Sequence, residues 1–295
     1  MNYYCPHCSE SPPPTEIRTF VRCGRYRRTS DRRVIQRFKC LLCKKTFSRA
    51  SFDPCFKQLK RQFNQSIFEH LASGVSQRRL AYLLRLNRKT IKRKFIFLGW
   101  QSNMLLRDFN LRFPKSQVVE FDDLETFEHS KCKPLSVTLA VESKTRRILS
   151  FSVSRMPAKG LLSKVAFKKY GPRIDERPRG RKRLFTELLD LVEPAAIFKS
   201  DQNPHYPQVV ETFFPQSEHW TTKGQRGSLG GQGELKKVQF DPIFSLNHTC
   251  AKLRADVNRL FRKTWCTTKK PDRLRMHIAI MALYHNQHLF LPKRV

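Results

Sequence analysis

The sequence has no uninterrupted apolar run of 18 or more residues, although 39% of its 295 residues are hydrophobic. A helix that crosses a bilayer needs such a run, so no transmembrane segment and no membrane partner are expected. The first residues, MNYYCPHC, also lack the charged and then apolar pattern of a secretory signal peptide. We therefore expect a protein of the reducing cytoplasm, where its nine cysteines act as metal ligands or buried thiols rather than as disulfides.

Acidic residues are scarce, since 24 Asp and Glu stand against 58 Lys and Arg and leave a formal net charge of +34. Compacting so much like charge costs self-repulsion unless a polyanion offsets it. Nucleic acid is such a polyanion, and it binds cationic proteins through the release of condensed counterions. Charge alone does not separate a DNA-binding protein from an RNA-binding or ribosomal one, so the motifs must decide.

Six of the nine cysteines lie within residues 1–55, and four of them form two C-x-x-C pairs. The pairs are Cys5 with Cys8 and Cys40 with Cys43. Each pair forms a tight turn that offers two thiolates, and two facing turns complete the tetrahedral sulfur shell that Zn²⁺ prefers. The spacing predicts a zinc ribbon over residues 1–55 with one structural Zn²⁺, while Cys23 and Cys55 remain ordinary small side chains.

Residues 60–100 have a helical pattern with few breaking residues, and residues 101–116 are expected to be a connector. Ser76 can cap a helix over residues 77–84, and a break at Leu86 and Asn87 precedes a second helix. Apolar side chains at positions 80, 83, 84, 91 and 95 give this segment an inner face. The pattern predicts an all-α helix-turn-helix domain. Its expected DNA contacts are Arg88, Lys89, Lys92 and Arg93.

The rest of the chain alternates between strand and helix patterns. Three strands are predicted at Gln117–Phe127, Leu135–Val141 and Arg147–Ser154. A basic stretch at 159–183 has little apolar periodicity and is expected either to be solvated or to follow the flanking DNA. After it we expect a helix at Lys182–Val192, a strand at Ala195–Ser200, a helix at Pro204–Phe214, a short strand at His219–Thr222, a mobile loop at Gly224–Gly233, and helices near 243–263 and 272–289.

Two aspartates follow or occupy buried strands in this region. Asp122 alternates with apolar Val119 and Phe121, and Asp201 comes directly after the apolar run that ends at Phe198. Two carboxylates at strand ends can hold a pair of divalent ions for phosphoryl transfer, and Mg²⁺ or Mn²⁺ suits oxygen ligands. Asp123 competes with Asp122 for this role, but its side chain is expected on the opposite face. Glu120 shares the face of Asp122 and would support the site indirectly.

Three strands, a helix, a strand and further helices follow the order of an RNase H-like domain, here over residues 115–290 with a basic insertion at about 159–183. The chain resembles transposases of the insertion sequence 1 and insertion sequence 1595 type. Its most specific piece is the segment from Leu253 and Arg254 to Asn258–Thr264. The resemblance implies a multidomain protein: an N-terminal zinc ribbon, a helix-turn-helix domain and an α/β catalytic domain, a mixed sheet flanked by helices. It implies further DNA contacts at Arg259, Arg262 and Lys263.

The resemblance also assigns the catalytic residues, with one departure from the family pattern. Asp122 and Asp201 match the first two acidic residues, and Tyr206 matches a tyrosine that often follows the second. The third position falls on Asn247, where much of the family has Glu, with Arg254 on the DNA phosphate. Asn247 can act as a ligand through its amide oxygen, as in some members. The alternatives are that Glu234 or Asp241 is the third acid, that neighbouring His248 contributes, or that the copy has decayed.

The resemblance implies an enzyme that binds the ends of an insertion sequence and catalyses metal-dependent cleavage and strand transfer of double-stranded DNA. The expected cofactors are one structural Zn²⁺ and two catalytic Mg²⁺ or Mn²⁺ ions. Two ends must be held together, so a homodimer or higher oligomer on the DNA is expected, in the prokaryotic nucleoid. The alternative function is a catalytically dead, transposase-derived DNA-binding regulator.

Overall fold

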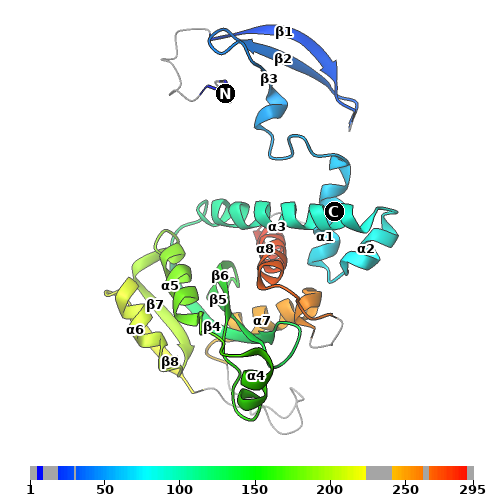
Figure 1. Ribbon diagram of the computed structural model, residues 1–295. Helices are drawn as coiled ribbons and strands as arrows, with labels where there is room; N and C mark the ends of the chain where they lie inside the picture. The colour runs from blue at the N-terminus through cyan, green and yellow to red at the C-terminus, as the bar shows by residue number, and fades with distance from the viewer. Residues whose placement is uncertain (1–4, 9–18, 30, 224–240, 262–265, 291–295) are drawn as a thin grey trace. The chain divides into compact units, whose positions relative to one another are not determined.

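A computed structural model describes the chain except for residues 1–4, 9–18, 30, 224–240, 262–265 and 291–295 (Figure 1). The chain forms two compact units, Met1–Ser66 and Ile67–Val295. The predicted loop at Gly224–Gly233 and the residues Glu234, Arg262 and Lys263 lie outside the described part of the chain. None of the described helices combines the length and the apolar character that a membrane-crossing segment requires.

The first unit is a small antiparallel sheet joined to two short helical turns. Its strands are β1 (Phe20–Arg27), β2 (Val34–Cys40) and β3 (Thr46–Ser48), in that spatial order, followed by the 3-10 turns η1 (Arg49–Phe52) and η2 (Arg61–Phe63). Phe20, Phe38 and Phe47 pack against one another with ring centroids 5.3–5.6 Å apart. Cys5 and Cys40 are buried with Phe47 in the same cluster. A core this small leaves much of the stability of the unit to the cysteine cluster beside it.

The second unit begins with three helices in the region where a helix-turn-helix is predicted. They are α1 (Asn64–Ala72), α2 (Gln77–Leu83) and α3 (Arg88–Asn110). The Ser76 hydroxyl accepts a hydrogen bond from the backbone N–H of Arg79, and the Asn87 side chain accepts one from that of Lys89. These side chains satisfy backbone donors that the first turn of a helix leaves free. The predicted cap at Ser76 and the predicted break before residue 88 are both confirmed.

Two details of the helical prediction are wrong. Leu83 was expected on the inner face but is 51% exposed, and Leu86 is buried instead. Residues 101–110 were expected in a connector but continue α3 to Asn110. The helix continues because Leu98, Leu106 and Phe109 are buried at helical spacing on the side where α3 packs against α8 (Pro271–Phe290).

A mixed five-stranded sheet forms the centre of the second unit, which confirms the predicted α/β class for this part of the chain. Its strands are β4 (Ser116–Phe127), β5 (Pro134–Glu142), β6 (Ile148–Arg155), β7 (Val192–Asp201) and β8 (Glu218–Thr222). The spatial order is β6-β5-β4-β7-β8. The β6–β5 and β5–β4 pairs are antiparallel, and the β4–β7 and β7–β8 pairs are parallel. Every strand predicted from the sequence is present within a few residues of its predicted bounds.

Helices cover both faces of this sheet (Figure 1). Phe121 of β4 packs against Phe185 of α5 (Arg177–Leu188) and Tyr206 of α6 (Tyr206–Phe213), with ring centroids 5.3 Å and 4.8 Å away. Neighbouring Glu120 instead contacts α7 (Phe244–Asp256). Because successive residues of a strand point to opposite faces, α5 and α6 lie on one face of the sheet and α7 on the other.

The basic stretch at 159–183 is not a solvated insertion, because it contains α4 (Leu162–Tyr170) and the first half of α5. Its Arg181 is only 4% exposed. A Cβ atom built on Gly180 would lie 2.0 Å from Ser154 Oγ, so the glycine allows α5 to approach β6 closely. The predicted helix at Lys182–Val192 therefore begins five residues earlier than expected, because basic residues dominate its first turns, while Leu184, Phe185 and Leu188 form its buried stripe.

Candidate functional site

The four cysteines of the two C-x-x-C pairs meet at one point of the first unit. Cys5 Sγ lies 3.5 Å from Cys43 Sγ, and Cys8 Sγ lies 3.6 Å from Cys40 Sγ. All four sulfur atoms lie within 4.8 Å of one another. A tetrahedron of sulfur atoms about 2.3 Å from Zn²⁺ has edges of about 3.8 Å, so the cluster fits a zinc ion.

The chemistry of these thiols also fits a cation. Hydrogen bonds that the Cys8 thiol shares with Cys43 and Cys40 raise the pKa of Cys8 to about 12. Thiols packed this closely cannot all ionise unless a positive charge lies among them, and a divalent ion would supply that charge. Cys23 and Cys55 lie outside the cluster, as predicted, and Cys55 Sγ accepts a hydrogen bond from Asn64 Nδ2 at 3.4 Å.

The second candidate centre lies where β4 and β7 run side by side in the same direction. The pairing joins Val119 to Phe198 and Glu120 to Lys199. Asp122 and Asp201 lie two residues further along their strands than Glu120 and Lys199. They therefore point to the same face of the sheet as that pair. The register of one parallel pair therefore brings together two aspartates that are 79 positions apart in the sequence.

The surroundings of Asp122 disfavour a lone negative charge. Burial, and then repulsion from Asp201, raise the pKa of Asp122 to about 7. The Tyr206 hydroxyl donates to Asp122 Oδ1 at 3.1 Å, and the backbone N–H of Asp123 donates to the same oxygen at 2.6 Å. These donors fix one carboxylate oxygen. A pair of carboxylates that repel one another is an arrangement that divalent cations stabilise.

Asp123 makes contacts that separate it from this pair. Its carboxylate accepts from Thr138 Oγ1 at 2.5 Å and lies 3.4 Å from the guanidinium of Arg181. Arg181 is buried and lies 5.9 Å from the centre of the Tyr206 ring. Asp123 is thus charge-paired on the α5 side of the sheet, and Asp122 is the better candidate for a metal ligand.

Glu120 anchors α7 to the strand that carries Asp122. Its carboxylate accepts from the backbone N–H of Leu246 at 2.9 Å and from Ser143 Oγ at 2.7 Å, and it is 2% exposed. Leu246 lies in the first turn of α7, where backbone N–H groups lack partners within the helix. The negative charge of Glu120 also suits the positive end of the helix dipole. Sequence reasoning gave Glu120 an unspecified supporting role and missed this contact, because 126 positions separate the two partners.

Helix α7 carries Asn247 and Arg254, the other two candidate catalytic residues. Both are exposed, and the Asn247 amide donates to Asp241 Oδ2 at 2.8 Å. Cys250 lies between them at helical spacing, and its pKa rises to about 12 because of burial and the negative charge of Asp122. A face of α7 is therefore close enough to interact electrostatically with the aspartate pair. Sequence reasoning did not consider Cys250.

Asp241 and His248, the described alternatives to Asn247 as the third metal ligand, make other contacts. Asp241 Oδ1 accepts from the backbone N–H of Ile243 at 3.1 Å, just before α7, so Asp241 lies beside Asn247 at the start of the helix. The His248 ring lies 3.2 Å from the guanidinium of Arg146. Among the residues that the structure describes, no His, Cys, Asp or Glu joins Asp122 and Asp201 to make a group of three potential ligands.

The predicted DNA contacts divide into exposed and partly buried residues. Arg88, Lys89, Lys92 and Arg93 are exposed in the first two turns of α3. Arg259, in the turn η4 (Asn258–Leu260), is different because its side chain is only partly exposed, its Nε is buried, and its guanidinium lies 5.4 Å from the centre of the Phe95 ring. Burial lowers the pKa of Arg259 to about 10.

Comparisons with known proteins give a distant likeness to a solved structure. No protein-family model matches the chain, and no curated protein matches it significantly. A solved structure of the catalytic domain of Mos1 mariner transposase matches with 15% sequence identity, covering 64% of this chain and 94% of that one, at a TM-score of 0.23. A TM-score this low does not establish a shared fold, so the site is judged on its own geometry.

Proposed function

We propose that this protein is a transposase that binds the ends of an insertion sequence and catalyses metal-dependent DNA cleavage and strand transfer. The observation that carries the proposal is the pair Asp122 and Asp201 at neighbouring positions of two parallel strands, with the charge of Asp201 raising the pKa of Asp122 to about 7. The net charge of +34 gives the chain the electrostatics of a DNA-binding protein. The order of strands and helices in the second unit supports an RNase H-like catalytic domain.

In this proposal Asp122 and Asp201 hold two Mg²⁺ or Mn²⁺ ions, with Asn247 as the third ligand through its amide oxygen. When bound, such ions lower the pKa of an attacking water or hydroxyl and offset charge on the leaving oxygen. Tyr206 orients Asp122 by donating to one of its oxygens, which leaves the other oxygen for the cation. Glu120 positions α7, and Arg254 contacts the DNA phosphate beside the reacting bond.

The remaining parts of the chain would recognise the DNA. The four-cysteine cluster holds one structural Zn²⁺ and stabilises a ribbon whose strands carry many arginines. The helices α2 and α3 act as a helix-turn-helix, with Arg88, Lys89, Lys92 and Arg93 on the duplex. Cleavage at both ends of an element requires two copies on the same DNA, so we propose a homodimer or a higher oligomer in the prokaryotic nucleoid.

A strand-transfer assay tests the proposal. Purified protein, with zinc retained, is given Mg²⁺ or Mn²⁺ and labelled duplexes that copy the DNA on either side of its own gene. Asp122→Asn and Asp201→Asn are expected to lower the rate of cleavage by about 10²–10³-fold while binding persists, since both remove charge where ions are held. Glu125→Gln is the matched control, because Glu125 is on the same strand but forms an exposed ion pair with Lys159. Equal activity in all four proteins would refute the assignment.

A regulator without catalytic activity is the second candidate, and Asn247 favours it. A neutral amide holds a divalent ion more weakly than a carboxylate, and no third acidic ligand is found among the described residues. Tight binding of the end duplex, with no cleavage under either metal, would support this candidate. Activity that is lost in Asn247→Ala and kept in Asn247→Asp would instead establish a working third ligand.

A further inference from the structure

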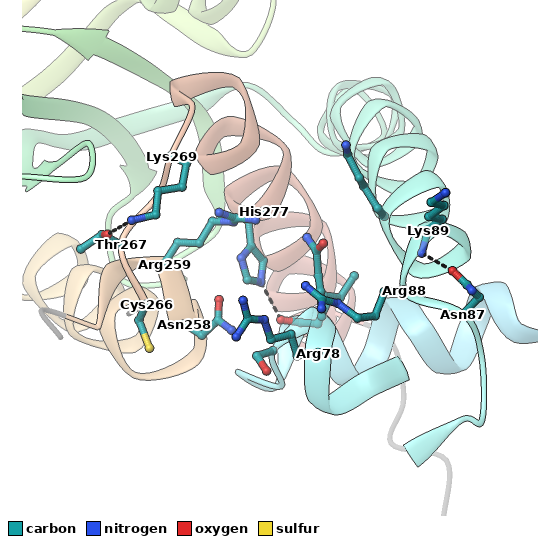
Figure 2. A pocket seen from close by; sticks show the side chains of 14 residues that line it. Arg78, Asn87, Arg88, Lys89, Asn258, Arg259, Cys266, Thr267, Lys269 and His277 are labelled. Carbon is teal, nitrogen blue, oxygen red and sulfur yellow. Dashed lines mark hydrogen bonds between the residues drawn. The ribbon is translucent and has the colours of Figure 1, made fainter. Parts of the chain in front are cut away.

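The second unit contains a cavity of about 1040 Å³ that is distinct from the aspartate pair. Its walls come from the end of α1, the starts of α2 and α3, the turn η4, the segment that leads into α8, and α8 itself at His277 (Figure 2). The starts of α2 and α3 belong to the proposed helix-turn-helix, and η4 and the segment before α8 follow α7. The cavity therefore lies where the DNA-reading helices meet the C-terminal part of the proposed catalytic domain.

The lining of this cavity is strongly cationic. Six basic side chains contribute to it, and they are Arg78, Arg88, Lys89, Lys92, Arg259 and Lys269. The lining residues include no Asp or Glu, and none of the first five cations has a carboxylate within salt-bridge distance among the described residues. Lys269 donates to His129 Nδ1 at 2.8 Å, which leaves its charge unpaired. Cations gathered around a hollow without acids repel one another and favour an anionic ligand.

The floor of the cavity contains two buried polar atoms without partners. Arg259 and His277 lie next to each other in Figure 2, and both line the cavity. Among the described residues only three buried side-chain polar atoms lack a hydrogen-bond partner, and two of them are Arg259 Nε and His277 Nδ1. Buried polar groups are normally satisfied, so a guanidinium N–H without a partner among the described residues is available to a ligand in the cavity.

His277 helps to hold this floor in place. Its Nε2 lies 2.9 Å from the backbone carbonyl oxygen of Leu71, which can only accept, so Nε2 donates. Burial lowers the pKa of His277 to about 4, and the ring therefore leaves Nδ1 as an acceptor for water or a ligand N–H. The positive charge of the floor comes from Arg259, whose guanidinium lies over the ring of Phe95. A planar guanidinium fixed in this way suits the oxygen atoms of a phosphate.

The composition of the lining distinguishes between kinds of anion. Among the lining residues that the structure describes there is no Phe, Tyr or Trp, and six carry positive charge, so this part of the wall suits phosphate oxygens better than a stacked base. The start of α3 contributes the positive end of a 23-residue helix to the same wall. We propose that the cavity binds the phosphodiester backbone of a DNA strand, with Arg259 at the floor and Arg78 and Lys269 on opposite sides.

The inference rests on the proposed function in one respect, because it takes the DNA of transposition as the anion. It adds a contact that ties the DNA to both the helical region and the segment after α7. Phosphate contacts fix the position of a protein on DNA without reading sequence. The cavity would therefore fix the position of the strand relative to the aspartate pair, while Arg93, which is exposed on α3 and does not line the cavity, remains available to read the bases.

DNA affinity as a function of salt tests this inference without any divalent metal. Fluorescence anisotropy is measured with a labelled duplex between about 50 and 200 mM salt, a range over which phosphate contacts change affinity strongly. The double variant Arg78→Gln/Lys269→Gln is expected to bind about tenfold more weakly at low salt. Its slope of log affinity against log salt is expected to be smaller by about 0.9 for each lost phosphate contact. The loss is expected to be the same for the DNA that flanks the gene and for an unrelated duplex.

The matched control is Arg112→Gln/Lys182→Gln, which removes the same charge from exposed positions of the second unit that do not line the cavity. Equal weakening in both double variants would overturn the inference, because general electrostatics would then explain the effect. Arg78 and Lys269 are exposed, so their substitution leaves the core intact. Arg259→Lys keeps the positive charge but lacks the guanidinium. This variant is expected to bind DNA more weakly, and an unchanged circular dichroism spectrum would show that it is still folded.

Inorganic phosphate distinguishes DNA from a small anion. If phosphate raises the melting temperature of the unmodified protein but not of Arg78→Gln/Lys269→Gln, and DNA affinity is equal in both, the cavity holds a free phosphate and the inference is wrong. None of these measurements depends on Asp122 or Asp201. A failed cleavage assay with intact, cavity-dependent DNA binding would therefore refute the transposase and leave the cavity assignment in place.

Discussion

The four-cysteine cluster and the aspartate pair are both candidate metal centres, but they are built in different ways. Each pair of cysteines is separated by only two residues, so the local turn already places two sulfur atoms together. Asp122 and Asp201 are brought together only by the parallel register of β4 and β7. The first centre therefore depends on its own ligands for stability, whereas the second depends on a sheet that is stable without it.

The largest expected effect follows from this contrast. Removing Zn²⁺, or substituting Cys40→Ser, is expected to unfold the first unit, since structural zinc contributes about 10 kcal/mol or more to domains with a small core. The second unit is expected to keep its structure. Limited proteolysis that is monitored by mass spectrometry would detect cleavage confined to residues before 67. Cys23→Ser, which changes a cysteine outside the cluster, is the control and is expected to leave the pattern unchanged.

Whereas bound zinc is expected to stabilise the first unit, the negative charge of the aspartate pair is expected to destabilise the second unit when no metal ion is bound. The pKa of Asp122 rises from 3.8 to about 7 in the folded chain, so the folded state holds a proton that the unfolded state releases. Stability is then expected to fall as the pH rises from about 4 to about 7, by up to about 4 kcal/mol. Asp122→Asn is expected to remove this loss when no Mg²⁺ or Mn²⁺ is added.

Thermal unfolding of the second unit between pH 4 and pH 8 checks this expectation. The variant Asp201→Asn separates the two causes of the raised pKa of Asp122, of which burial is the larger and the charge of Asp201 the smaller. That variant is expected to remove only the smaller part of the pH dependence. An identical decline with pH in the unmodified protein and in Asp122→Asn would contradict the assignment.

The anchor of α7 is expected to have an intermediate effect. Glu120→Ala removes a buried carboxylate that accepts from Leu246 N–H and Ser143 Oγ, and we expect a loss of about 2–3 kcal/mol in the free energy of unfolding. Urea unfolding measures it. Glu125→Ala on the same strand breaks only an exposed ion pair and is expected to cost under about 1 kcal/mol. Equal losses would mean that Glu120 has no special role in holding α7.

The smallest expected effect concerns the helical region. Ser76→Ala removes the side-chain cap of α2 and is expected to cost about 1 kcal/mol. Gln77→Ala, one position later, leaves the cap in place and is expected to change stability by less than half of that. Urea unfolding of both variants compares them, and a larger loss in Gln77→Ala would show that the hydroxyl of Ser76 is not the stabilising group.

The sequence predicted the features that local patterns encode. The strands β4, β5 and β6 were found because β-branched and apolar side chains dominate them, and the cap at Ser76 because a hydroxyl stands before a helical pattern. The cysteine cluster followed from spacing alone. The choice of Asp122 and Asp201 needed a resemblance to a family as well, because isolated aspartates are common on protein surfaces.

Features that depend on partners distant in the sequence were missed. The contact of Glu120 with α7, the partly buried position of Arg259 and the extension of α3 to Asn110 all arise from packing between segments far apart in the chain. The helix α5 was predicted to begin at Lys182 rather than at Arg177, because Arg181, a buried arginine paired with Asp123, looks like a solvated charge in the sequence. Charge patterns alone do not indicate which arginines find a carboxylate inside the fold.

The bond between Glu120 and the first turn of α7 also bears on how such proteins tolerate insertions. Because α7 is fixed to β4 by this contact, the length of the connection between β8 and α7 does not set the position of the helix. Homologues with longer or shorter connections at this point would keep the same spacing between Asp122 and the residues of α7. A change in the length of this connection would then leave the distance between α7 and β4 unchanged.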